Sequence, residues 1–281
     1  MGLIVLVVSV AILSFFLGVV SVFWWLVPKI ENRFVFRPDR RIFQTPADRG
    51  VPFERVFFEA SDGPRLSAWH LCPTKPRAAI LYFHGNSGNL GLFTEVFQLL
   101  YQHRLQVFAV DYRGYGQSTG DPSEDGLHRD ALAAIEYFNQ HFRIQSVPLI
   151  YWGRSLGCCV AAFAASQEAP DGLVLESGFP SKKHLLKYFP QFRAFRIFSK
   201  CRLDTARYLH NQPYPVLVVH GDKDQTIPFE QGRRLYDSLT GRKEFYHVEG
   251  ADHINTHRLD SKAYMERILN FVEQSRRELV H

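Results

Sequence analysis

The pentapeptide GRSLG at residues 153–157 constrains this chain more than any other feature, because of the sequence on either side of it. An apolar run at 149–152 comes directly before it, and an alanine-rich stretch at 156–168 follows. We therefore expect a buried strand to turn sharply into a helix here, with the two glycines relieving the crowding of so tight a turn. Such a turn holds the hydroxyl of Ser155 above the edge of a sheet, where it can act as a nucleophile.

Short apolar runs alternate with amphipathic stretches along most of the chain. Strands are predicted at 78–83, 107–110, 149–152, 173–175, 216–219 and 244–248, and helices at 92–103, 124–142, 156–168, 229–239 and 259–275. Upstream, two strands at 55–59 and 66–72 flank the turn signal SDGP at 61–64, which predicts an opening hairpin. Strand followed by helix, repeated, predicts an α/β fold whose mostly parallel sheet carries helices on both faces.

The bulk composition is that of a folded protein with one α/β domain. A chain of 281 residues with 46% hydrophobic and 22% charged residues can bury a substantial core. The net charge of +5 comes from Lys and Arg interleaved with Asp and Glu, so we expect no nucleic-acid partner. Cys72, Cys158, Cys159 and Cys201 show no CxxC spacing and no companion histidines at zinc-finger intervals, so we expect free thiols and no metal site.

The N-terminal residues 3–27 carry no charged side chain. As a helix this run is about 37 Å long, which exceeds the roughly 30 Å hydrocarbon core of a bilayer. A cleaved signal peptide is the alternative, but no basic residue precedes the run and no small-residue cleavage site precedes Pro28. We therefore predict an uncleaved membrane anchor, with Trp24 and Trp25 at the interface and Pro28 ending the helix.

Basic residues lie only on the far side of this anchor: Lys29, Arg33, Arg37, Arg40 and Arg41 follow it, and no Lys or Arg precedes it. The positive-inside rule then predicts that the folded domain faces the cytosol. A lumenal or periplasmic domain is the alternative, since large domains can be translocated despite flanking charges. We expect a transmembrane anchor at 1–28, a connector at 29–53 and an α/β domain at 54–281.

The loops after two later strands carry an acid and a base. A serine hydroxyl needs a base that removes its proton and an acid that orients this base. The strand at 216–219 leads into Asp222 and Asp224, and position beyond the strand does not decide between them. The last strand leads into His253, the expected base, with His257 as its local rival.

The anionic oxygen of a tetrahedral intermediate needs two donors placed in advance. One is expected to be the backbone N–H of Leu156, directly after the nucleophile. The second is expected from Asn86 in the glycine-rich loop HGNSGN at 84–89, which follows the strand at 78–83. A phosphate-binding loop is excluded, because this loop lacks the GK[ST] ending.

Two further segments lie where they can support or cover such a site. The segment DYRGYGQS at 111–118 follows another strand, and we expect Asp111 and Arg113 to brace the turn at Ser155, with a direct substrate role as the alternative. Residues 179–214, rich in Phe, Lys and Arg, interrupt the strand and helix rhythm. They form a candidate cap, or alternatively a crossover helix with a decorated loop.

Taken in order, the motifs HGNSGN, DYRGYGQSTG, GRSLG, DQTIP and GADHIN resemble those of the membrane-anchored α/β-hydrolase domain-containing proteins, with a serine-aminopeptidase-like hydrolase domain. The similarity runs from about Glu54 to the C-terminus. It implies the α/β-hydrolase fold with a Ser, Asp, His order, and it implies Asp224 rather than Asp222 as the acid. Cys158, where a glycine is common, and Asp252, before the histidine, depart from the family pattern.

These residues predict acyl transfer to water, in which Ser155 attacks an ester, thioester or amide carbonyl, His253 moves the proton and Asp224 fixes its tautomer. No metal or organic cofactor is required. The anchor and the aromatic, basic segment 179–214 favour lipid esters or acylated membrane proteins as substrates at the bilayer. The alternatives are an aminopeptidase, which would need an acidic pocket for a substrate ammonium group, and a membrane-tethered scaffold without turnover.

Overall fold

The structure is a computed structural model that describes residues 2–188 and 201–277. Its centre is an eight-stranded sheet with the order β10-β9-β8-β7-β4-β6-β3-β2. The strands are β2 Glu54–Glu59, β3 Arg65–Leu71, β4 Ala78–Phe83, β6 Leu105–Asp111, β7 Leu149–Arg154, β8 Gly172–Glu176, β9 Val216–Gly221 and β10 Lys243–Val248. The six strands from β10 to β6 pair in parallel, whereas β3 is antiparallel to both β6 and β2. The predicted hairpin and the mostly parallel sheet are confirmed.

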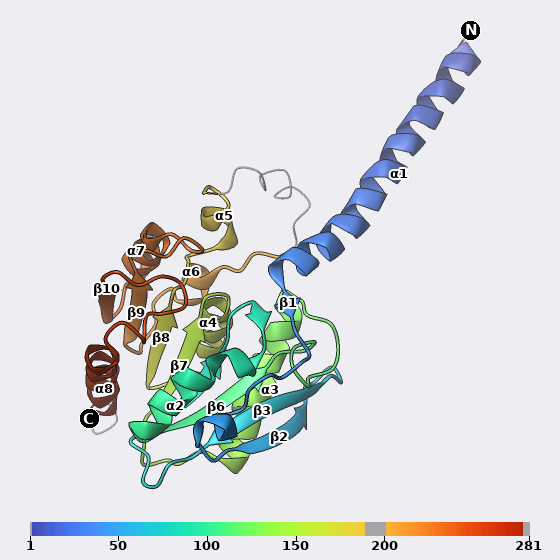
Figure 1. Ribbon diagram of the computed structural model, residues 1–281. Coiled ribbons are helices and arrows are strands. Elements are labelled where there is room, and N and C mark those ends of the chain that lie inside the picture. The colour runs from blue at the N-terminus through green and yellow to red at the C-terminus, as the bar shows by residue number, and fades with distance from the viewer. Residues whose placement is uncertain (1, 189–200, 278–281) are drawn as a thin grey trace.

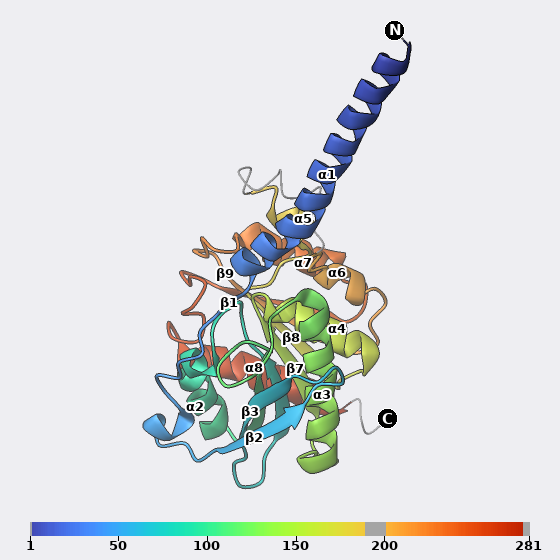
Figure 2. The same cartoon turned by 90° about the vertical axis from the view of Figure 1, so that its right-hand side faces the viewer.

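The helices that cover the sheet lie within a few residues of their predicted ranges. They are α2 Thr94–Gln102, α3 Glu124–His141, α4 Gly157–Gln167, α7 Phe229–Ser238 and α8 Ser261–Arg277, with the 3-10 turns η1 Pro46–Arg49 and η2 Leu90–Phe93. Figures 1 and 2 show them on opposite sides of the sheet, with α3 and α4 on one face and α2 and α8 on the other.

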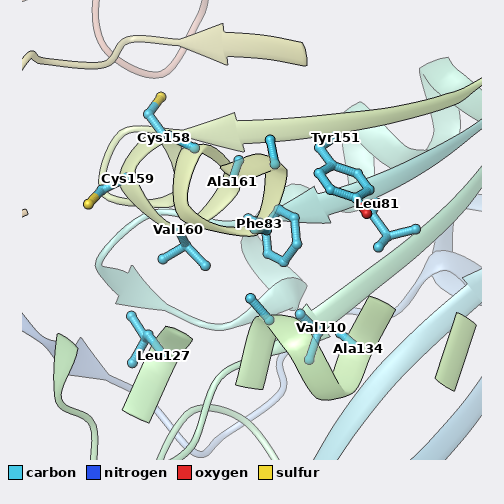
Figure 3. Close-up of a cluster of buried hydrophobic side chains, with 14 of the residues drawn as sticks. Leu81, Phe83, Val110, Leu127, Ala134, Tyr151, Cys158, Cys159, Val160 and Ala161 are labelled. Carbon is cyan, nitrogen blue, oxygen red and sulfur yellow. The ribbon is translucent and has the colours of Figure 1, made fainter. Parts of the chain in front are cut away.

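The central strand β4 shows why the sheet is buried on both faces. Leu81 and Phe83 point into the core under α3 and α4, and Ile80 and Tyr82 point into the core under α2 and α8. Because successive side chains of a strand alternate between faces, a continuous apolar run such as AAILYF suits a strand with a helix layer on each side. Figure 3 shows the first of these cores, in which Leu81 and Phe83 share one cluster with Leu127 of α3 and Val160 of α4.

The N-terminal helix α1 runs from Gly2 to Val35. Its stretch Ile4–Leu26 is long and apolar enough to cross a membrane, and none of it is buried against the domain. The prediction that Pro28 ends this helix is wrong. A proline inside a helix costs about 3 kcal/mol, but contacts at the far end of α1 hold the helical backbone: the Phe36 N–H donates to the Asn32 carbonyl (2.8 Å), and the Phe36 side chain is buried in the core.

The predicted connector at 29–53 contains the end of α1, the short strand β1 and the 3-10 turn η1. After α1 comes β1 (Arg37–Pro38), which pairs in parallel with β5 (Ser87–Gly88) in a two-stranded sheet. The candidate cap contains two short helices, α5 (Lys182–Leu185) and α6 (Thr205–Tyr208), and its residues 189–200 lie outside the described part of the chain. In Figures 1 and 2, α5 and the end of α1 lie at the same end of the domain.

Candidate active site

The turn between β7 and α4 has the sharp geometry that the sequence predicts. Ser155 has a φ of +55°, which is rare for a residue with a side chain and costs about 1–3 kcal/mol. Its N–H donates to the Glu176 carbonyl at 2.8 Å. Neither flanking glycine could carry a side chain: a Cβ on Gly157 would lie 2.0 Å from the Phe83 carbonyl oxygen, and one on Gly153 would lie 2.3 Å from the Gly157 oxygen. The two glycines therefore allow the strand and helix to meet at this turn.

Three side chains that are far apart in the sequence meet above this turn. The Nε2 atom of His253 lies 3.1 Å from the Ser155 Oγ, and its Nδ1 atom lies 2.7 Å from the Asp224 Oδ2. Ser155 follows β7, Asp224 lies in the loop after β9, and His253 lies in the loop after β10. Because parallel strands end at the same edge of a sheet, their following loops converge. The structure thus brings together the predicted serine, acid and base.

The environment of Asp224 keeps it ionised. Burial by itself would raise the pKa of this carboxyl group, but hydrogen bonds from His220 and His253, together with the backbone N–H of Ile227, outweigh burial and hold its pKa below the ordinary value. The Asp224 Oδ1 accepts the N–H groups of Thr226 and Ile227 at 2.9 and 2.8 Å. The carboxylate is therefore fixed in orientation with its second oxygen toward His253.

The two rival residues lie elsewhere. Asp222 accepts the N–H of Gly250 at 2.7 Å and faces His247, so its carboxylate links the loops after β9 and β10. His257 is buried with Nε2 3.9 Å from Glu95, and burial lowers its pKa. Neither is hydrogen-bonded to Ser155 or to His253 in the described residues.

The backbone N–H groups of Asn86 and Leu156 are free to donate to a ligand oxygen. Within residues 2–188 and 201–277, no acceptor is hydrogen-bonded to either group, and both residues line one pocket with Ser155. The preceding residue, Gly85, packs directly against the serine, since a Cβ built on it would lie in ordinary van der Waals contact, 3.5 Å from the Ser155 Cβ. The two residues that the sequence predicts as oxyanion donors thus lie beside the serine.

Two tyrosines that the sequence analysis missed hold the Asn86 loop. The hydroxyl of Tyr115 donates to the Asn86 carbonyl at 2.8 Å, and that of Tyr112 donates to the His84 carbonyl at 3.0 Å. Their signal was present in the segment DYRGYG, where two aromatic residues follow a strand at the same sheet edge.

The prediction that Asp111 and Arg113 brace the turn at Ser155 is wrong. The Arg113 guanidinium binds Asp62 and Asp130 at 2.8 and 2.7 Å, which ties the opening hairpin to α3. The Asp111 carboxylate accepts the Leu90 N–H at 3.0 Å, and burial raises its pKa to about 7. Both residues lie at or just beyond the end of β6, and β4 separates β6 from β7 in the sheet.

Comparisons with known proteins agree with this architecture. A family model described as the alpha/beta hydrolase fold matches residues 78–197. The membrane protein YNL320W of Saccharomyces cerevisiae is 30% identical over 237 residues, which cover 80% of this chain and 84% of that protein. The chain belongs to the α/β-hydrolase family.

Two further relatives of this α/β hydrolase carry descriptions of activity. The lysophosphatidylserine lipase ABHD12 of Danio rerio is 29% identical, over 77% of this chain and 69% of that protein. The solved structure of the esterase Pf2001 of Pyrococcus furiosus superimposes with a TM-score of 0.70 at 19% identity, and it covers 85% of this chain and 97% of the esterase. The likeness to the esterase is one of fold.

A buried ion pair, also missed from the sequence, connects the serine turn of this α/β hydrolase to the histidine loop. The Arg154 guanidinium donates to the His253 carbonyl at 3.0 Å and lies 3.6 Å from the Glu176 carboxylate. Glu176 also accepts the Trp152 indole N–H at 3.1 Å, and the hydroxyls of Thr256 and Tyr264. Glu176 is fully buried, so these donors replace the water that its charge would otherwise need.

A pocket of about 390 Å³ opens beside Ser155, within the size range of small-molecule sites. Its walls are mostly apolar, and Asn86 and Thr226 are among its polar lining residues. The described lining residues are Phe34, Val35, Arg37, Asn86, Ser155, Leu156, Phe179, Lys182, Leu185, Leu186, Leu203, Thr226 and Ile227. Such a pocket can hold an apolar group next to the nucleophile.

Among the described residues, a cluster of metal-ligand type is formed by side chains of α3 and α4. Possible ligand atoms of Glu124, His128 and Cys159 lie within 4.8 Å of one another. The Glu124 carboxylate accepts the N–H groups of Arg202 and Leu203 at 2.6 and 2.7 Å, which fastens the end of the cap to α3. Glu124 therefore has a structural role without a metal ion.

Proposed function

We propose that this protein is a serine hydrolase that transfers an acyl group from an ester, thioester or amide to water, with Ser155 as nucleophile, His253 as base and Asp224 as its orienting acid. The observation that carries the proposal is the chain of short contacts from Asp224 through His253 to a serine in a strained turn. Strained backbone is kept where the surrounding structure requires it, typically at functional sites.

The contacts support a role for each group in this proposal. The Asp224 carboxylate accepts a hydrogen bond from the Nδ1–H of His253, which leaves Nε2 as the free base beside Ser155. His253 removes the hydroxyl proton as the Ser155 oxygen bonds to the substrate carbonyl carbon. It then delivers this proton to the departing alcohol, thiol or amine. A water molecule, activated by the same imidazole, attacks the acyl-serine and releases the acid.

The substrate carbonyl oxygen, which becomes negative during both attacks, would accept hydrogen bonds from the backbone N–H groups of Asn86 and Leu156. The bracing of this loop by Tyr112 and Tyr115 keeps one donor in place before the substrate arrives. A donor fixed in advance is worth about 100- to 1,000-fold in rate.

We propose a carboxylesterase or lipase-like activity within this class. The pocket beside Ser155 is apolar, and among its described lining residues the charged side chains are those of Arg37 and Lys182, both basic. A peptide ammonium group would be repelled by them, which disfavours an aminopeptidase. The relative ABHD12 is named a lysophosphatidylserine lipase, which supports an acyl ester as substrate.

We also propose that α1 anchors the enzyme in a membrane with the hydrolase domain in the cytosol. The apolar stretch Ile4–Leu26 and the relative described as a membrane protein support the anchor. The basic residues that follow the span support the orientation. A reporter fused to the C-terminus tests it, since an external signal from the reporter would contradict the cytosolic assignment.

Labelling with a fluorophosphonate probe tests the nucleophile. The full-length protein in detergent should be labelled, Ser155→Ala should not, and Ser166→Ala should be labelled as the wild type is, because Ser166 is exposed at the far end of α4. Labelling of Ser155→Ala would mean another nucleophile. A series of p-nitrophenyl esters beside aminoacyl amides then separates the activities: an esterase cleaves the first series, a peptidase the second, and a scaffold neither.

A further inference from the structure

The end of α1 is hydrogen-bonded to the loop that carries the proposed oxyanion donor. The Asn86 Nδ2 donates to the Val35 carbonyl at 3.1 Å, and the Arg37 N–H donates to the Asn86 carbonyl at 2.9 Å. Pairing of β1 with β5 continues this contact on the next residues. Phe36, between these contacts, is 2% exposed in the core. Asn86 is therefore held through its side chain by the last turn of α1 and through its carbonyl by the first residue of β1.

The same turn forms one wall of the pocket beside Ser155. Phe34 and Val35 lie on the α1 side of the pocket, and Leu185 and Leu186 lie on the cap side. Phe34 is 66% exposed, so its ring contributes little to the core and is available to an apolar ligand. An exposed aromatic ring at the wall of an apolar pocket is suited to contact with an acyl chain.

The helix also sets the distance between the pocket and the membrane. At 1.5 Å per residue, Val35 lies about 13 Å along α1 from Leu26, the last residue of the apolar stretch. The headgroup layer on each side of the hydrocarbon core is about 5–8 Å thick. The pocket therefore starts just outside the headgroups, and an acyl chain must leave the bilayer over a short distance to enter it.

We propose that the last turn of α1 is part of the active site: through Asn86 it positions the oxyanion loop, and through Phe34 and Val35 it walls a pocket that takes the acyl chain of an amphiphilic ester from the membrane that holds the anchor. The inference rests on the proposed hydrolase function. It makes Phe34 a specificity-determining residue, and it makes the length of α1 beyond the membrane span a determinant of which esters reach Ser155.

A chain-length profile tests the role of Phe34. Full-length Phe34→Ala should lose about tenfold in kcat/KM toward p-nitrophenyl decanoate and less than twofold toward p-nitrophenyl acetate, because the short acyl group does not reach the removed ring. Phe43→Ala is the matched control, since Phe43 is an equally exposed ring that lies outside this pocket. An unchanged ratio of decanoate to acetate in Phe34→Ala, or an equal change in Phe43→Ala, would overturn the assignment.

A spacer tests the supply from the membrane. Seven helix-forming residues inserted after Lys29 add about 10.5 Å and two turns, so the helix keeps its face toward the domain. In nanodiscs, hydrolysis of bilayer-embedded 4-methylumbelliferyl palmitate should fall at least tenfold, and hydrolysis of soluble 4-methylumbelliferyl acetate should not change. Equal rates before and after insertion, or an equal fall on both esters, overturn this part. If the wild type cleaves neither ester, the proposed function itself fails.

Discussion

Replacing Arg154 by Met should destabilise the domain far more than loss of an ordinary surface arginine would. Arg154 is buried and lies 3.6 Å from a Glu176 carboxylate with no exposed surface. Removing one partner of a buried pair leaves the other charge uncompensated, at a cost of about 3–5 kcal/mol. For a domain of this size that corresponds to a fall in Tm of about 6–20 °C. Differential scanning calorimetry measures it directly.

The same change should reduce activity, because Arg154 also donates to the His253 carbonyl. Without that donor the histidine loop can shift, and a displacement of about 1 Å costs about 100-fold in rate. We expect kcat for p-nitrophenyl acetate to fall 10- to 100-fold with little change in KM. Arg258→Met is the control: its pair with Glu95 is half-exposed, so the expected loss is at most about 1 kcal/mol.

The pH dependence and a double variant identify the cause. Burial alone would raise the pKa of Glu176, but Arg154 and the hydrogen bond from Thr256 hold that pKa below its ordinary value. A carboxyl with a depressed pKa adds stability above its unfolded pKa and loses it as pH falls. In Arg154→Met the burial effect dominates and the pKa of Glu176 rises above its ordinary value. The variant's deficit in free energy of unfolding against wild type should therefore shrink from pH 7 to pH 5. Adding Glu176→Gln should recover most of the loss at pH 7. A loss below 1 kcal/mol, or a double variant no more stable than the single one, would refute the reasoning.

Three further predictions concern the site. Asp224→Asn should lower kcat about 10,000-fold while the fold is kept, because an amide no longer selects the Nδ1–H tautomer of His253; steady-state kinetics beside circular dichroism checks it. Asn86→Ala keeps its backbone N–H but loses the bond to the Val35 carbonyl, so kcat should fall about tenfold for acetyl and decanoyl esters alike; unequal losses would contradict a positioning role. Gly157→Ala places a Cβ 2.0 Å from the Phe83 oxygen and should prevent stable folding, seen as insoluble expression, whereas soluble active protein would contradict the packing described.

Local sequence pattern was sufficient for most elements of the fold. The run AAILYF at 78–83 is β4 with the same bounds, and Ser155 has the strained backbone that the flanking glycines indicate. Both depend on interactions within a few residues, namely apolar periodicity and backbone crowding, so the sequence contains them directly. The order serine, acid, base along the chain was also visible, because each residue follows an apolar strand.

Other features required the arrangement of strands in space. Whether Arg113 or Arg154 supports the serine turn depends on which strands are neighbours, and the sheet order places β8 with Glu176 directly beside β7. Tyr115 meets Asn86 because β6 and β4 are paired. The partner of a long-range contact is chosen by the sheet topology, which no local pattern specifies.

The anchor helix illustrates the division most clearly. The sequence by itself determined that a long uncharged helix precedes an α/β domain with a nucleophile turn, because helix length and apolar character are sums over neighbouring residues. That the helix continues past Pro28 and ends against Asn86 was decided by the tertiary structure. Local propensity disfavours a helix through a proline by about 3 kcal/mol, and burial of Phe36 together with hydrogen bonds to a loop some fifty residues away opposes that preference.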